Sequence, residues 1–328
     1  MRKLILHIGG GKTGSSAIQH FLASNRTKLN EFGVGIPTHD LKPKSRVTGE
    51  HVWYFNKIRK LNPGDASALL RRDLKPIGFS QNSNIHTIIL SAENLSDPHR
   101  WNTLFSPLRD EYDIEIIFYI RRQDDYLISA WQQWYAKIND DFWPWILSNV
   151  GSKGDWLTTI NDYAQFIPDD KMNIGLFQRA SLKNGNVVED FISKLGASFA
   201  DYDGWKEVNN ESNSSVNLAI QDIVEKNQHL FENSHDNGFY NFILEYSPSA
   251  KKTPNHTLLS FDQRRAIIHQ YNRQNSEIKS RFFKDRVTLF DPPRKNKKVV
   301  SKEELLDMKL NTVFEVLYGL YKERNKNG

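Results

Sequence analysis

The first stretch of the chain constrains its fold more than any other. Residues 4–8 form an apolar run that is typical of a buried strand, and glycines occupy positions 9–11 directly after it. Apolar residues then recur at helical spacing, at Ile18, Phe21 and Leu22. The pattern predicts a strand, a tight glycine-rich loop and the N-terminus of a helix.

A loop of this kind favours an anion, because the N–H groups of a helix's first turn and the positive end of its dipole point at whatever occupies the loop. Lys12 adds a positive charge, and hydroxyl donors follow at Thr13, Ser15 and Ser16. Glycines alone would fit any turn between a strand and a helix. A lysine and three hydroxyls beside them favour the binding of a phosphate or a sulfate.

The loop does not match a Walker A loop when that pattern is placed on Gly11-Lys12-Thr13. The pattern requires a glycine, four residues and then Gly-Lys-Ser/Thr, and its first glycine would fall on Leu6. A phosphate-binding loop of the kinase type is therefore disfavoured.

Composition excludes several kinds of site. The chain has 328 residues, a net charge of +5 and no cysteine, so disulfides, thiolate metal sites and thiol nucleophiles are ruled out. The mild positive charge suits an anionic ligand better than a nucleic acid. No apolar run is long enough for a signal peptide or a membrane span, and we expect a cytoplasmic protein without a metal.

Further strands are predicted at residues 86–91, 114–120 and 172–177, with helical patterns between them. This alternation predicts an α/β fold with three layers, in which helices cover both faces of a mostly parallel sheet. We expect one domain over residues 1–328, with insertions or acceptor-side elements at 38–84 and 138–170. The region 250–328 should be helical, with capping boxes beginning at Ser260 and Ser301.

A second motif follows the strand at 114–120. Arg121 lies at the end of that strand, and Ser129 comes eight residues later, about two turns into the next helix. The guanidinium and the hydroxyl could hold one phosphate together. Taken alone, the pattern is better explained by an ion pair of Arg121 with Asp124 or Asp125 and by a serine on the solvent face.

Taken together, the two motifs resemble those of sulfotransferases that use 3′-phosphoadenosine 5′-phosphosulfate (PAPS), and the chain is similar to bacterial members that act on carbohydrates. Residues 12–16 resemble the Lys-Ser/Thr-Gly-Thr/Ser-Thr/Ser loop that grips the 5′-phosphosulfate in that family. Arg121 and Ser129 have the spacing with which the family binds the 3′-phosphate. The resemblance implies a P-loop-like fold and transfer of a sulfuryl group from PAPS to a hydroxyl or amine, which leaves adenosine 3′,5′-bisphosphate.

The resemblance also implies which residues bind the cofactor: Gly11, Lys12, Thr13, Gly14, Ser15 and Ser16 for the phosphosulfate, Arg121 and Ser129 for the 3′-phosphate, and Asn210 and Ser212 for a further polar loop.

The sequence departs from the family's pattern in two places. Ala17 occupies a position where cytosolic sulfotransferases often have a tryptophan, and their Arg-Lys-Gly loop near the C-terminus is not evident. Adenine must therefore stack on another side chain.

In this reaction Lys12 would neutralise charge on the leaving phosphate, and the acceptor would need a general base. We expect Glu93 to be that base, because it follows the strand at 86–91, which should end beside the loop. Asp40, His51 and His7 are the alternatives.

The acceptor is expected to be a carbohydrate or another hydroxyl-bearing molecule, since Trp134 and Trp143 could stack on sugar rings. Two other functions stay open. One is a P-loop kinase of a small metabolite, and the other is a non-catalytic protein that binds a nucleotide or a polyanion. The oligomeric state is open as well.

Overall fold

The computed structural model describes residues 1–37, 50–75, 84–97, 101–138, 141–206, 217–249, 256–295 and 298–326. The contacts divide the chain into two compact units. The sheet unit comprises Met1–Arg122, Asp155–Asn210 and Gln274–Phe290, and the helical unit comprises Gln123–Gly154, Glu211–Arg273 and Asp291–Gly328.

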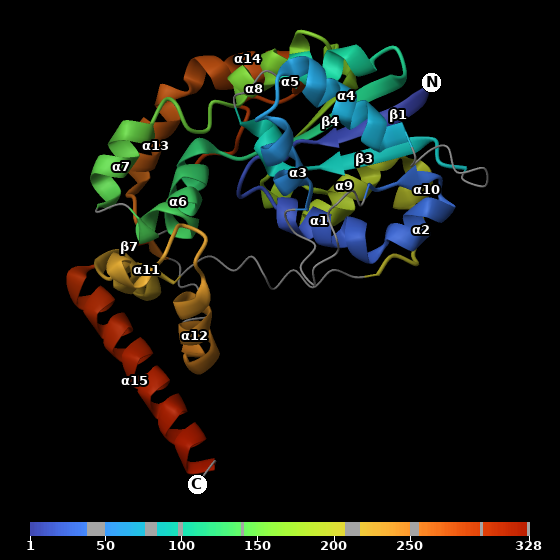
Figure 1. Ribbon diagram of the computed structural model, residues 1–328. Helices are drawn as coiled ribbons and strands as arrows, with labels where there is room; N and C mark the ends of the chain where they lie inside the picture. Colours follow the sequence, from blue (N-terminus) through green and yellow to red (C-terminus); the bar gives the residue numbers. More distant parts are fainter. Residues whose placement is uncertain are drawn as a thin grey trace. The chain divides into compact units, whose positions relative to one another are not determined.

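The sheet unit is built on five parallel strands in the order β2-β3-β1-β4-β5 (Figure 1). These are β1 (Arg2–His7), β2 (Val34–Gly35), β3 (Thr87–Ser91), β4 (Tyr112–Ile120) and β5 (Met172–Leu176). The central strand β1 pairs with β3 on one side and with β4 on the other. Because every strand runs the same way, all five carboxyl ends meet at one edge, which is where ligands of such sheets bind.

One face of the sheet is covered by α1 (Ser15–Ser24), α9 (Val187–Leu195) and α10 (Ala197–Ala200), with α2 (Arg26–Glu31) following α1. Ile5, Ile89 and Ile117 from three neighbouring strands share a buried cluster with residues of α1 and α9, including Ile18 and Phe191. The β-strand alternation sends every second side chain to this face and the others to the opposite face.

The opposite face is covered by α3 (Glu50–Ile58), α4 (Pro63–Leu74), α5 (Trp101–Phe105) and α8 (Trp156–Ala164) (Figure 1). Phe55 of α3 packs on Trp101 of α5, with ring centroids 5.9 Å apart, and Phe118 of β4 packs on Trp156 at 6.0 Å. Helices therefore lie on both faces, and the three-layer α/β fold expected from the sequence is confirmed.

The helical unit contains α6 (Gln123–Gln133), α7 (Phe142–Asn149), α11 (Leu218–Lys226), α12 (Gly238–Tyr246), α13 (Phe261–Gln270) and α15 (Lys302–Lys326). Helix α14 (Asn272–Phe282) belongs to the sheet unit from Gln274 on. A short parallel pair joins β6 (His256–Thr257) to β7 (Lys298–Val299). The helical C-terminal region is confirmed, and so are both predicted capping boxes: Ser260 with Gln263 and Ser301 with Glu304 exchange side-chain and backbone hydrogen bonds.

A buried ion pair joins α13 to the N-terminus of α6 within the helical unit. Arg264 is 2% exposed, and its Nε donates to Asp124 at 2.6 Å while its Nη2 donates to Asp125 at 2.5 Å. The two aspartates thus neutralise Arg264 as well as complementing the dipole of α6.

Among the helices that the structure describes, none combines the length and apolar character needed to cross a membrane.

Candidate active site

The glycine-rich loop connects β1 to α1 at the carboxyl edge of the sheet. Its first half follows β4, because the N–H groups of Ile8 and Gly10 donate to the carbonyls of Ile117 and Tyr119 at 3.0 and 3.2 Å. A Cβ at Gly10 would lie 3.0 Å from the Tyr119 carbonyl oxygen, a tight contact, so this close approach favours a glycine. The second half is closed by Thr13, whose N–H and hydroxyl both donate to the Gly10 carbonyl.

Two residues of the loop have left-handed backbone conformations, Lys12 with φ of 63° and Gly14 with φ of 84°. Gly14 is the N-cap of α1 and has no side chain to cap the helix. Because the N-cap makes no side-chain bond to the first turn, the N–H groups at the start of α1 can face the loop, as an anion site requires.

The start of α1 gives the loop a second alignment with the Walker A pattern, on Gly14-Ser15-Ser16. Helix α1 begins at Ser15, so Gly14-Ser15-Ser16 stand at the helix start, whereas Gly11-Lys12-Thr13 lie in the turn before it. Gly9 lies five residues before Gly14. The glycine spacing of a P-loop is therefore present, and the lysine of that pattern is replaced by Ser15.

The carboxylate of Glu93 lies beside this helix start. The hydroxyl of Ser15, a residue that is only 4% exposed, donates to Oε2 of Glu93 at 2.8 Å. Glu93 is the first residue of the 3₁₀ helix η2 (Glu93–Ser96), which follows β3, the neighbour of β1. It lies beside the loop for the reason that the sequence suggested, since adjacent parallel strands end at the same edge.

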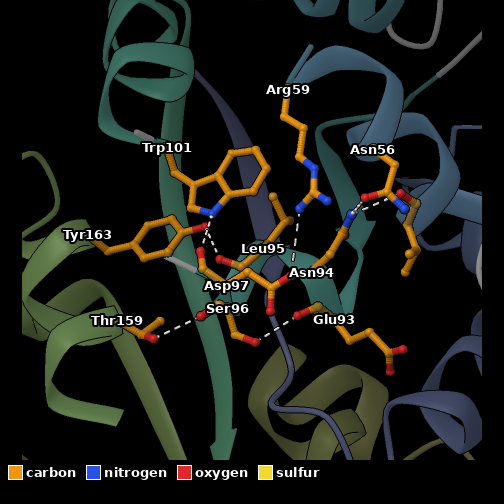
Figure 2. A network of polar contacts seen from close by, with 11 residues as sticks. Asn56, Arg59, Glu93, Asn94, Leu95, Ser96, Asp97, Trp101, Thr159 and Tyr163 are labelled. Atoms are coloured by element: carbon orange, nitrogen blue, oxygen red, sulfur yellow. Dashed lines mark hydrogen bonds and ion pairs between the residues drawn. The ribbon is translucent and has the colours of Figure 1, made fainter. Parts of the chain in front are cut away.

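A network of polar contacts holds the turn that carries Glu93 (Figure 2). The side chain of Asn94 donates to the Val52 carbonyl and to Asn56, both on α3, at 2.9 and 3.1 Å. From α8 and α5, three further side chains donate to backbone carbonyls of the turn: Thr159 to Ser96, Tyr163 to Leu95 and Trp101 to Asp97. In Figure 2 the Glu93 carboxylate points away from these contacts. They hold the backbone of the turn, and the carboxylate binds Ser15 at the start of α1.

Arg121, at the end of β4, is bound to the same loop. Its Nη1 donates to the carbonyl of Lys12 at 2.9 Å, and its guanidinium lies 5.6 Å from the centroid of the Phe177 ring. Trp156 donates from Nε1 to the Arg121 carbonyl at 2.8 Å.

The two aspartates weighed above as partners of Arg121 both bind Arg264. Ser129 lies on the second turn of α6 in the helical unit, and its joint grip on one phosphate with Arg121 stays a prediction.

The two histidines considered as alternative bases are buried. His7 is 1% exposed, its Nδ1 lies 2.7 Å from Oγ of Ser91, and burial lowers the pKa of His7 to about 3. His51 is 5% exposed; its Nδ1 accepts the Ser91 N–H at 2.9 Å, and its Nε2 donates to the Pro37 carbonyl at 3.0 Å. Protonation of His51 would break the first of these bonds.

Asp40, the third alternative, and the proposed cofactor residues Asn210 and Ser212 lie outside the described residues.

A cavity of about 280 Å³, including its opening to solvent, lies next to this site. Two of its lining residues belong to the elements that carry the Ser15–Glu93 bond: Gln19 is one helical turn beyond Ser15 on α1, and Ser91 ends β3 two residues before Glu93. The lining residues are Gln19, Leu22, Ala23, Arg26, Ile36, His51 and Ser91.

Sequence reasoning missed Gln19 and Trp156. Gln19 could have been found from its spacing, because it lies four residues after Ser15 on the same face of the predicted helix. Nothing in the sequence indicated the second, because its bond joins a helix to the end of a strand 35 residues away.

Across the described part of the chain, no three or more His, Asp or Glu side chains come together in a way that could hold a metal ion.

The chain was compared with protein-family models, curated proteins and solved structures. No protein-family model matches the sequence, and no curated protein matches it. The chain is similar in structure to a sulfotransferase from Alicyclobacillus acidocaldarius, with 16% sequence identity and a TM-score of 0.40, over 64% of this chain and 88% of that one.

Proposed function

We propose that this protein transfers a sulfuryl group from PAPS to a hydroxyl or amine of an acceptor, with a carbohydrate hydroxyl as the favoured class. The hydrogen bond between Ser15 and Glu93 carries the proposal, because it sets a carboxylate at the mouth of an anion-binding loop. A reaction that moves an anionic group onto a hydroxyl needs both parts, an anion cradle and a proton acceptor.

In this proposal the loop holds the 5′-phosphosulfate of PAPS. The N–H groups at the start of α1, the Ser16 hydroxyl and the Lys12 ammonium supply donors and positive charge. Gly11 and Gly14 let the backbone approach the anion, and Thr13 keeps the loop closed. Arg121 and Ser129 would bind the 3′-phosphate, and Asn210 and Ser212 would add contacts from their loop.

The transfer is an in-line displacement at sulfur. Glu93 takes the proton of the acceptor hydroxyl while the acceptor oxygen forms its bond to sulfur. The bond between sulfur and the bridging oxygen breaks, and the electron pair stays on the 5′-phosphate of the departing adenosine 3′,5′-bisphosphate. Lys12 and the dipole of α1 stabilise that charge.

The cavity beside Gln19 and Ser91 is the proposed site of the acceptor. Its lining includes an amide, a hydroxyl and a guanidinium, which are typical partners of sugar hydroxyls, and Gln19 lies one helical turn beyond Ser15, whose hydroxyl binds Glu93.

A P-loop kinase of a small metabolite is the second candidate, and the spacing of Gly9 and Gly14 favours it. Ser15 counts against it, because a hydroxyl bonded to a carboxylate supplies no positive charge to a triphosphate at the position where kinases of this type have a lysine.

Calorimetry separates these candidates. We expect the protein to bind adenosine 3′,5′-bisphosphate without magnesium and to bind Mg·ATP much more weakly. Tight binding of Mg·ATP without binding of the bisphosphate would establish the kinase alternative instead. Labelled PAPS, offered with a panel of carbohydrates in the presence of EDTA, then tests transfer. Bisphosphate binding with no turnover on any acceptor would favour a non-catalytic nucleotide-binding protein.

A further inference from the structure

Helix α15 packs one of its faces against other helices of the helical unit. Lys309 donates to Asp222 of α11 at 2.7 Å, and the hydroxyl of Tyr246, the last residue of α12, donates to Glu323 at 2.7 Å. Thr312, which lies between these two positions of α15, is only 2% exposed. Contacts with α11 and α12 therefore fix which side of α15 faces the helical unit.

The other side of α15 is apolar and exposed. The large side chains of this outer stripe are between 39% and 66% exposed: Leu306, Leu310, Val313, Phe314, Leu317, Tyr318, Leu320 and Tyr321. Monomeric proteins rarely expose a contiguous apolar patch of more than a few hundred Å². Together these side chains expose on the order of several hundred Å², which approaches one partner's share of a stable protein interface.

The spacing within the outer stripe is that of a coiled coil. Steps of four, three, four and three residues separate Leu306, Leu310, Val313, Leu317 and Leu320. These are the steps between the a and d positions of a heptad, which form the seam between two helices that lie side by side. Apolar residues scattered singly over a surface need no such period. The stripe therefore fits a second helix that lies along α15.

The charges of α15 favour a second copy of the same helix, running in the opposite direction. Glu303, Glu304 and Asp307 lie in its first two turns. Lys322 and Arg324 lie in its last two turns. In an antiparallel pair the acidic start of each helix lies beside the basic end of the other, whereas a parallel pair sets like charges against each other. Such self-complementarity is what a twofold dimer requires.

A lipid surface is another partner that an exposed apolar helix face can have. Helices that lie on membranes are rich in lysine and arginine, which the anionic lipids attract. Residues 302–325 instead carry four lysines or arginines and five aspartates or glutamates. The charge balance of the helix therefore favours a protein partner over a membrane.

We infer that α15 pairs with α15 of a second copy of this chain in an antiparallel coiled coil, which makes the protein a homodimer. The dimer does not rest on the sulfuryl transfer proposed above, because it concerns the outer stripe of α15 alone and is tested by mass and by crosslinking.

Sedimentation velocity of the full-length protein tests the dimer. At about 10 µM we expect a species with twice the 38.1 kDa mass of the chain. In the double variant Leu310→Glu/Leu317→Glu the dissociation constant should rise about 100-fold or more, because the pair of helices would bury four carboxylates. Both leucines are about half-exposed in the single chain, so the variant should keep its fold, which near-UV circular dichroism checks.

The double variant Leu147→Glu/Val287→Glu is the matched control. Leu147 of α7 is 73% exposed and Val287 is 93% exposed, and neither belongs to α15. This variant gains the same two charges at exposed apolar positions. It should sediment as a dimer, as the wild type does.

Introduced cysteines test the direction of the pair, since the chain has none of its own. We expect a bis-maleimide to crosslink a mixture of Leu306→Cys and Leu320→Cys, and to crosslink either variant alone much less. A flexible reagent tolerates an offset of one helical turn, about 5 Å, between the two positions. Efficient crosslinking of Leu306→Cys to itself would show a parallel pair and would overturn the antiparallel arrangement.

A monomer at about 100 µM would overturn the inference, and so would undiminished dimerisation of Leu310→Glu/Leu317→Glu. If the wild type is a monomer and floats with phosphatidylcholine vesicles while this variant does not, the outer stripe binds a lipid surface in place of a second copy.

Discussion

The hydroxyl of Ser15 and the carboxylate of Glu93 lie 2.8 Å apart, although 78 positions separate them in the sequence. The bond joins the first residue of α1 to the first residue of η2, the 3₁₀ helix that follows β3. The start of α1 and the carboxylate of Glu93 therefore lie together at the carboxyl edge of the sheet.

Replacing Glu93 by glutamine tests its role as the base. We expect kcat to fall about 100-fold or more, with little change in the KM for PAPS, because glutamine still accepts the Ser15 hydrogen bond and cannot take a proton. Initial rates with labelled PAPS give both values. Glu31→Gln is the control, since Glu31 is exposed and pairs with Lys28. An unchanged kcat in Glu93→Gln would move the base elsewhere, with Asp40 as the first alternative.

Two substitutions of Lys12 separate its charge from its backbone strain. Lys12→Ala and Lys12→Gly should both lower kcat about 100-fold, because both remove the ammonium. Lys12→Gly should be more stable than Lys12→Ala by about 1 kcal/mol, because the φ of 63° at this position is left-handed. Urea denaturation measures the difference. Equal stabilities would show that the loop relaxes once the lysine is removed.

Arg121→Ala should act on cofactor affinity. We expect the affinity for adenosine 3′,5′-bisphosphate to fall about 10- to 100-fold, since a charge-assisted contact to the phosphate is lost together with the bond to the Lys12 carbonyl. Ser129→Ala should weaken it by a smaller factor. Calorimetry measures both, with Arg72→Ala as the control because the Arg72 side chain is 74% exposed. Wild-type affinity in Arg121→Ala would contradict the proposed 3′-phosphate site.

His7 should make the stability depend on pH. Its pKa is about 3 in the folded protein against 6.5 for the unfolded chain, so the unfolded chain binds the proton more tightly. The stabilisation is complete above pH 6.5 and is lost as the pH falls from 6.5 toward 3. Between pH 7.5 and pH 5 this group should account for about 2 kcal/mol of the free energy of unfolding.

The replacement His7→Phe keeps an aromatic ring beside Tyr119 and Phe191 and removes the titration. Its unfolding free energy should therefore change less between the two pH values than that of the wild type. Urea denaturation at pH 7.5 and pH 5 compares them, and the same pH dependence in both proteins would count against a neutral, buried His7.

Local patterns predicted most of the secondary structure. Helix α9 runs from Val187 to Leu195, in agreement with the helical spacing of its apolar residues and with Gly196 directly after it. No glycine or proline interrupts residues 15–31, which favours one helix over this range, but the structure divides it into α1 and α2 at Asn25. The Asn25 side chain donates to the Lys206 carbonyl and accepts its N–H, a contact across 181 positions that local spacing cannot show.

The sequence by itself determined the α/β layering and the position of the glycine-rich loop. It also indicated Lys12, Glu93 and Arg121 as candidate site residues near the ends of strands. These features follow from burial and hydrogen bonding within short segments, which the spacing of apolar residues and glycines encodes directly.

Only the tertiary structure decided that α1 ends at Ser24, that Ser15 binds Glu93, and that Asp124 and Asp125 bind Arg264. Each of these depends on which elements become neighbours. The placing of β1 between β3 and β4 brings their ends together, and the packing of α13 on α6 brings Arg264 to the two aspartates. Such pairings arise from burial of the whole core, and no local pattern in the chain specifies them.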